Sequence, residues 1–184
     1  MSKVVLIIFL SMAATETLKN PKYTLIEKHG KIEVREYSEY VIAKTSISQG
    51  DMELNNNMFR TLAGYIFGGN NKSQSIPMTA PVITKNDKSS YDMIFFMLDA
   101  NKPEDLPLPN SSNVSIEMME IGKTISITFG MWATESRVAY YKKKLDKYIN
   151  DNNLELESPL MVAQYNSPWA IPPFRKNELI YKIK

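Results

Sequence analysis

The chain has 184 residues, of which 43% are hydrophobic and 23% charged, a composition typical of one globular domain. Lys and Arg number 22 against 20 Asp and Glu, so the net charge of +2 is too small to indicate a nucleic-acid-binding surface. The absence of Cys excludes disulfides and cysteine nucleophiles, and the single His excludes sites that need two imidazoles, so we expect no structural metal.

The first residues of the chain are typical of a targeting signal. Lys3 precedes an apolar run over residues 4–10, and the small residues Ser11 and Ala13 follow it. The run is too short to cross a bilayer, which takes about 20 apolar residues, and it fits a secretory signal peptide over residues 1–13. We therefore expect a secreted or periplasmic protein without a membrane span; the alternative is an N-terminal strand or tail on a cytoplasmic protein.

Two kinds of periodicity follow in residues 23–98. Apolar and polar residues alternate in the predicted strands, and a turn at His29-Gly30 indicates a hairpin. Between the strands, apolar residues recur every three or four positions, as on one face of a helix, and Gly68-Gly69 ends that helix. In chain order, the predicted strands and helix cover residues 31–37, 41–47, 54–66, 79–84 and 91–98.

The same order of elements recurs in residues 113–184, after a Pro-rich connector over residues 99–112. A turn is expected at Gly122-Lys123, and Thr134 is expected to cap the second helix. The predicted elements cover residues 114–118, 125–131, 134–149, 160–165 and 178–183. We therefore predict an α+β fold over residues 23–184: a twisted or open β-barrel of two ββαββ-like pseudo-repeats, flanked by two α-helices.

Several motifs carry a resemblance to a known family. They are IEVREY at residues 32–37, LAGYIFGGN at 62–70, IPMTAPV at 76–82, PLP at 107–109, YNSP at 165–168 and FRKNE at 174–178. With these motifs in this order, the chain resembles the SOUL haem-binding protein family from Tyr23 to its end. The resemblance implies a twisted barrel with two flanking helices, and non-covalent binding of haem or other tetrapyrroles without enzymatic turnover.

A haem site requires an apolar surface for the porphyrin ring and cations for its two propionates. The first helix, the strands beside it and the loops near the C-terminus offer such residues, with Arg60 as the expected propionate partner. The ordinary alternative for the apolar members is the protein core. The candidate ligand-binding residues are Met58, Phe59, Arg60, Leu62, Tyr65, Met78, Phe95, Tyr165, Phe174 and Arg175, with Trp169 on the rim.

Axial ligation of the iron by histidine is not expected. His29 is the only imidazole, and it stands in a predicted hairpin turn, where side chains usually face water. The resemblance places the family's proposed iron ligand just before the Tyr of the first Arg-x-Tyr motif, and that residue is Glu36 here, a poor haem ligand. Ligation by a Tyr or Met side chain stays open.

Catalytic motifs are missing from the sequence, since neither a GxSxG elbow nor a phosphate-binding glycine loop is present. We therefore expect no enzyme. The predicted function is that of a carrier or buffer for haem or another porphyrin. The alternative is a sensing or interaction domain for amphipathic small molecules or partner proteins, in which haem binding is incidental.

Overall fold

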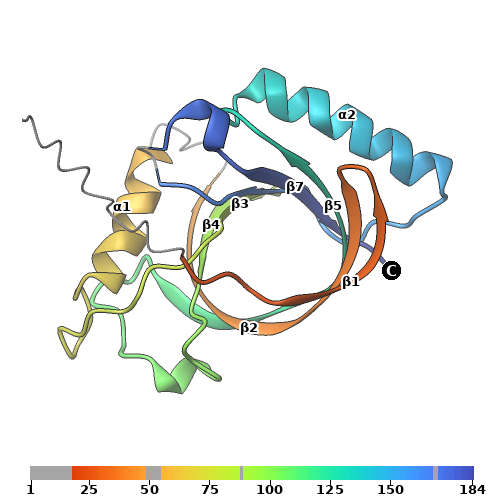
Figure 1. The fold of residues 1–184 in the computed structure, drawn as a ribbon. Coiled ribbons are helices and arrows are strands. Elements are labelled where there is room, and N and C mark those ends of the chain that lie inside the picture. The colour runs from red at the N-terminus through yellow and green to blue at the C-terminus, as the bar shows by residue number, and fades with distance from the viewer. Residues whose placement is uncertain (1–17, 49–54, 88, 168–169) are drawn as a thin grey trace, which may run out of the picture.

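Seven antiparallel strands and two α-helices make up the described part of the chain (Figure 1). This computed structural model describes residues 18–48, 55–87, 89–167 and 170–184, so the predicted signal peptide and Trp169 lie outside it. The elements are β1 (Tyr23–His29), β2 (Ile32–Ser48), α1 (Asn55–Ile66), β3 (Val82–Asn86), β4 (Ser90–Phe96), β5 (Ser115–Phe129), α2 (Glu135–Asp151), β6 (Met161–Gln164) and β7 (Asn177–Lys182), with short 3-10 helices at Pro103–Asp105 (η2) and Pro172–Phe174 (η3).

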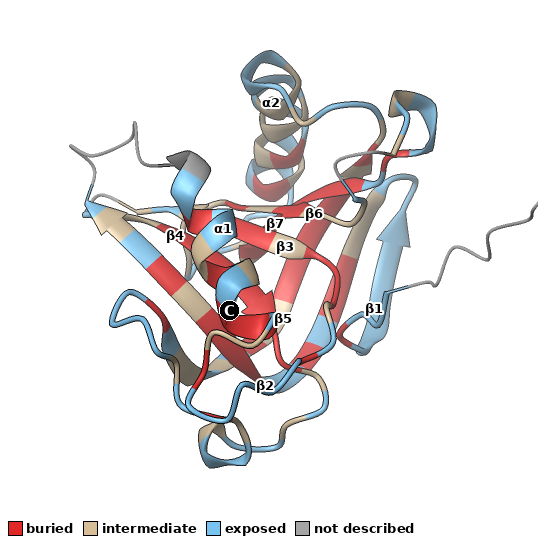
Figure 2. Ribbon diagram, turned by 90° about the vertical axis from the view of Figure 1, so that its left-hand side faces the viewer, coloured by how far each residue is buried: buried red, intermediate tan, exposed pale blue. Residues whose placement is uncertain are grey.

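The sheet closes on itself. Its strand order is β1-β2-β4-β3-β6-β7-β5, and β5 also pairs with β2. This last pairing closes the strands β2, β4, β3, β6, β7 and β5 into a six-stranded barrel. Strand β1 pairs with β2 outside this ring and is exposed along its whole length (Figure 2). Helices α1 and α2 pack on the outside of the barrel, α1 against β2 and β4 and α2 against β5 and β7. The predicted fold class, an α+β barrel with two flanking helices, is confirmed.

Each half of the barrel contributes a strand, a helix and two further strands. The unit β2-α1-β3-β4 corresponds to β5-α2-β6-β7, because β2 pairs with β4 as β5 pairs with β7. The two units meet through the β2–β5 and β3–β6 pairings. The long strands β2 and β5 therefore run past each other and connect the two units.

The predicted turn at Gly122-Lys123 is wrong, because β5 is continuous there. Gly122 has a φ of 64° and lies opposite Tyr37, and the next residue pair is left out of the ladder. Ile121 points into the barrel, whereas Ile125 packs beneath α2, so the inward face changes between them. At such an irregularity the side chains that faced inward begin to face outward, so the alternation of apolar and polar residues shifts by one position. A turn between two strands interrupts the alternation in the same way, and the two cases look alike in the sequence.

Three groups of buried hydrophobic residues stabilise the fold (Figure 2). One lies beneath α1 and includes Leu62, the second lies beneath α2 and includes Leu145, and the third lies inside the barrel and includes Phe96. The expected cap of α2 is present, since Thr134 accepts a hydrogen bond from the Arg137 backbone N–H. Within the described residues, no helix combines the length and the hydropathy of a membrane span.

Candidate ligand-binding groove

The inside of the barrel is filled by its own side chains. The cavity that remains there measures about 20 Å³ and is lined mainly by apolar residues, among them Tyr37, Phe96, Met161 and Tyr165. Such a volume holds about one water molecule, whereas sites for small organic ligands enclose roughly 300 Å³ or more. A porphyrin therefore does not fit inside the barrel as it stands.

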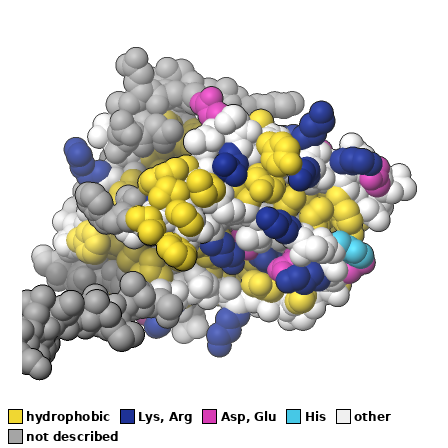
Figure 3. All heavy atoms as spheres, turned by 45° about the horizontal axis from the view of Figure 1, so that its top comes forward, with side chains coloured by type: hydrophobic (Ala, Val, Ile, Leu, Met, Phe, Trp, Pro, Cys, Tyr) yellow, Lys and Arg dark blue, Asp and Glu magenta, His cyan; other side chains and the backbone are white. Residues whose placement is uncertain are grey.

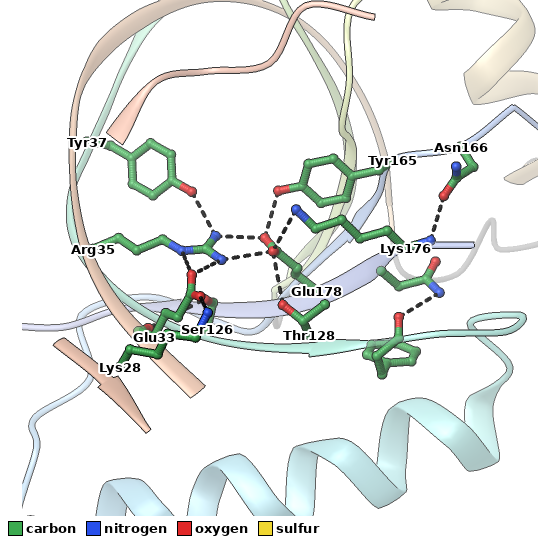
Figure 4. A network of polar contacts seen from close by, with 12 residues as sticks. Lys28, Glu33, Arg35, Tyr37, Ser126, Thr128, Tyr165, Asn166, Lys176 and Glu178 are labelled. Carbon is green, nitrogen blue, oxygen red and sulfur yellow. Dashed lines mark hydrogen bonds and ion pairs between the residues drawn. The ribbon is translucent and has the colours of Figure 1, made fainter. Parts of the chain in front are cut away.

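A buried ion pair occupies the polar part of the barrel interior (Figure 4). Arg35 of β2 donates two hydrogen bonds to the Glu178 carboxylate of β7, at 2.8 Å and 2.9 Å. The two side chains are only 2% and 0% exposed. Arg35 also donates to Glu33 at 2.6 Å, so its guanidinium lies between two carboxylates. Paired geometry of this kind is required to compensate the loss of hydration of a buried charge.

Further donors complete the surroundings of Glu178. The Tyr165 hydroxyl donates to one carboxylate oxygen at 2.7 Å, and Thr128 donates to the other at 3.2 Å. The Lys176 ammonium lies 3.1 Å from the same carboxylate. Burial opposes ionisation of Glu178, but the hydrogen bonds and charge of Arg35 outweigh it and lower the carboxyl pKa to about 2.

Two tyrosines face this pair with different consequences. Burial raises the pKa of Tyr37 to about 12, although the positive charge of Arg35 acts to lower it. Burial, together with the negative charge of Glu178 and the hydrogen bond to it, raises the pKa of Tyr165 far above its ordinary value. Because the Tyr165 hydroxyl is neutral and donates into the barrel, it is not placed to ligate iron as a phenolate.

Because of the buried ion pair, the free energy of unfolding is expected to depend on pH. The pKa of Glu178 is about 2 in the folded protein against an ordinary 4.5, so its contribution is present above about pH 4.5 and is lost as the pH falls towards 2. We expect wild type to lose on the order of 3 kcal/mol through this group between pH 5 and pH 2. Urea unfolding at several pH values measures the loss. Glu178→Gln should flatten this dependence, and an unchanged slope in that variant would contradict the assignment.

An apolar groove lies outside the barrel, between α1 and the segments that lead into β3 and out of β6. It measures about 190 Å³. Phe59 and Ala63 of α1 and Phe67, directly after its end, form the α1 side of the groove, because residues four apart share one face of a helical turn. Phe59 is 41% and Phe67 70% exposed, and the Phe59 ring rests on Phe95 with the ring centroids 5.5 Å apart. The other lining residues are Leu18, Met78, Thr79, Ala80, Val82, Gln164, Tyr165, Asn166 and Ser167.

The structure separates the ten predicted ligand-binding residues into four groups. Three of them line the groove, namely Phe59, Met78 and Tyr165. Four belong to the core beneath α1 and are at most 2% exposed, namely Met58, Leu62, Tyr65 and Phe95. Arg60 is exposed, next to Phe59 on the flank of α1 that turns away from the core. Contact of the predicted ligand-binding residues with a ligand remains a prediction.

The last two predicted residues lie at the 3-10 helix η3 and do not line the groove. Phe174 is 73% exposed. The Arg175 guanidinium stacks on the Trp132 ring at 3.8 Å and donates to the Ala170 carbonyl at 2.9 Å. Arg175 therefore holds the loop around it.

Exposed hydrophobic side chains gather on the face that includes the top of Figure 1, with Lys and Arg side chains among them (Figure 3).

Ala63 and Phe67 line the groove but were not among the predicted ligand-binding residues, although both belong to the motif at residues 62–70. The helical periodicity selects the strongest apolar stripe, which is the buried one, and these residues lie on its flank. The spacing of Phe59, Ala63 and Phe67 at intervals of four was the available signal. This spacing does not show whether the rest of the chain covers that side of the helix.

The comparisons with known proteins agree with the resemblance noted in the sequence. The model of the SOUL heme-binding protein family matches residues 18–182, and the chain belongs to this family. Heme-binding protein 1 of Xenopus laevis is 27% identical over 162 residues, which cover 83% of this chain and 84% of that protein.

Solved structures share the fold at low identity. The C-terminal domain of EcmrR superposes with a TM-score of 0.64 and 12% identity, over 88% of this chain and 98% of that one. A hydrolase from Listeria innocua superposes with a TM-score of 0.56 and 11% identity, over 84% and 92%. At these identities the likeness concerns the fold alone. Within the described residues, no group of three or more His, Asp or Glu side chains is placed to hold a metal ion.

Proposed function

We propose that this protein binds haem or a related tetrapyrrole non-covalently in the α1 groove and acts as a carrier or buffer. The observation that carries the proposal is an open apolar groove beside a barrel whose interior is already filled. Phe59, Phe67 and Met78 offer ring and thioether contacts for the face of a porphyrin. Membership of the SOUL heme-binding family and the similarity to Heme-binding protein 1 support the choice of ligand.

The expected affinity fits a carrier. At about 190 Å³ the groove is smaller than a site that encloses a small organic ligand, and it is open along one side, so a macrocycle would be only partly covered. Burial of about 400 Å² of apolar surface at ~25 cal/mol per Å² contributes on the order of 10 kcal/mol. The loss of translational and rotational freedom then reduces this to a micromolar or weaker affinity. A ligand held in this way is released readily, as transport requires. The predicted signal peptide makes export of this carrier part of the proposal.

An absorption titration with hemin tests the proposal. Binding in one groove predicts a saturable shift of the Soret band at a stoichiometry of one hemin per chain. A sensing or interaction domain would instead bind apolar dyes and lipids equally well, and these would displace hemin at similar concentrations. A titration without saturation would overturn the proposed function.

His29 is not expected to ligate the iron. It lies at the end of β1, where its imidazole contacts the Glu27 carboxylate at 2.5 Å and packs against Tyr148 of α2. Helix α1, which forms one wall of the groove, lies on the other side of the barrel (Figure 1). We therefore predict that His29→Ala leaves the Soret spectrum and the hemin affinity unchanged. Loss or a large shift of the Soret band in this variant would reinstate histidine ligation.

Arg60 is proposed to pair with a haem propionate at the outer edge of the groove. Arg60→Ala should weaken hemin binding by about three- to tenfold, the range of one exposed charge-assisted contact. The same variant should bind a porphyrin dimethyl ester as wild type does, since the ester carries no free carboxylate. Lys143→Ala, an exposed residue of α2, is the matched control. Equal losses for hemin and ester would refute the pairing.

A further inference from the structure

Tyr165 separates the groove from the interior of the barrel. It follows directly after β6, and its ring lines both the groove and the internal cavity. On the inner side the ring meets a space bounded by Ile83, Phe96 and Met161. On the outer side it faces the space that α1 covers from the opposite wall.

The ring is held in this place by contacts on the barrel side. Its hydroxyl donates to Glu178 at 2.7 Å, and Glu178 is itself held by Arg35 (Figure 4). The Lys176 ammonium lies 4.0 Å from the centre of the Tyr165 ring and 3.1 Å from Glu178. The backbone N–H of Lys176 also donates to Asn166 Oδ1 at 2.6 Å, next to the ring. Glu178, a buried residue of β7, thus contacts the side chain that forms this wall of the groove.

We propose that Tyr165 is the specificity-determining residue of the groove, because its ring closes the inner end and keeps the site shallow enough to favour flat ligands. Glu178 and Lys176 act as positioning residues for that ring. This inference rests on the proposed function and names the feature that selects the shape of the ligand.

Removal of the ring connects the two spaces. The groove of about 190 Å³ would join the internal cavity and the volume that the ring leaves, which gives a deeper apolar pocket. Depth favours a compact apolar molecule, which can enter the barrel, whereas a rigid macrocycle cannot follow it there. The relative affinity for the two kinds of ligand should therefore change, beyond any general loss of stability.

The experiment measures dissociation constants for hemin and for the neutral fluorophore N-phenyl-1-naphthylamine in wild type, Tyr165→Ala and Tyr37→Ala. Tyr37 is the matched control, since it lines the same internal cavity and accepts a hydrogen bond from Arg35 at 3.1 Å but does not line the groove. We expect the ratio of the two constants to shift at least tenfold towards the fluorophore in Tyr165→Ala. In Tyr37→Ala it should stay within about twofold of wild type.

Tyr165→Phe provides a second test if the alanine variants do not fold, which thermal unfolding shows. It keeps the ring and loses the bond to Glu178, so the ratio should shift two- to threefold in the same direction. An unchanged ratio in the Tyr165 variants, or an equal shift in Tyr37→Ala, would overturn the inference. A wild-type protein that binds no hemin would overturn the proposed function instead, and the fluorophore affinities alone would still report the depth of the groove.

Discussion

Glu178→Ala is expected to lower the free energy of unfolding by about 3–5 kcal/mol, the range measured when one partner of a buried ion pair is removed. The Arg35 guanidinium is only 2% exposed and would lose both of its hydrogen bonds to the carboxylate. Glu33 would remain as its only close carboxylate among the described residues. Tyr165 would lose its acceptor at the same time.

Urea unfolding monitored by circular dichroism measures this loss. Lys147→Ala is the control, because it breaks an exposed ion pair with Asp151 on α2 and should change stability by less than about 1 kcal/mol. The double variant Arg35→Met, Glu178→Leu should recover much of the lost stability, since it removes both buried charges and Glu33 keeps its ion pair with Lys28 at 2.8 Å. A loss below about 1 kcal/mol in Glu178→Ala would contradict the assigned role of the pair.

Ala63→Trp is expected to weaken hemin binding at least tenfold. Ala63 lies one helical turn from Phe59 and from Phe67 on the α1 side of the groove, so an indole at this position occupies the space assigned to the porphyrin. The added side chain enters an open groove of about 190 Å³ rather than the packed core. Folding should therefore be retained, and thermal unfolding checks this point.

Gly64→Ala is the matched control on the neighbouring position of α1. Its new Cβ would meet no atom within 4 Å, and Gly64 is exposed. Replacement of a helical glycine by alanine should stabilise the helix by up to about 1 kcal/mol without a change in hemin affinity. If Ala63→Trp folds and still binds hemin within twofold of wild type, the porphyrin does not occupy this groove.

The periodicity of the sequence predicted the fold class because buried faces repeat every two residues in strands and every three to four in helices. It failed at Gly122, where β5 changes its inward face without a turn. It also could not show that the barrel closes, since closure depends on the pairing of β2 with β5, whose residues lie far apart in the chain. Pairing between distant strands depends on register, which local patterns determine only weakly.

The candidate site was only partly predictable for a related reason. Met58 and Leu62 have the strongest helical spacing, and they form the core because burial drives that spacing. Phe59 was predicted and lines the groove, but its flank of α1 stays open only because of how the segments around β3 and β6 pass it. Such an arrangement belongs to tertiary structure and leaves no local signal in the sequence.

The motifs that indicated the family have structural positions that the sequence did not show. Arg35 and Glu178 belong to two different motifs and lie 143 residues apart in the chain, and they form the buried ion pair of the barrel. Met78 and Val82 belong to a third motif and line the groove. The motifs therefore include residues that hold the barrel together as well as residues that face the candidate ligand.

Amide chemical-shift mapping with diamagnetic zinc protoporphyrin tests the location of the ligand most directly. A porphyrin in the α1 groove predicts the largest shifts at residues 59–67, 78–82 and 164–167, with small changes on β1 and α2. Largest shifts along α2 or at the β1–β2 turn, with residues 59–67 unaffected, would contradict the placement of the ligand against α1.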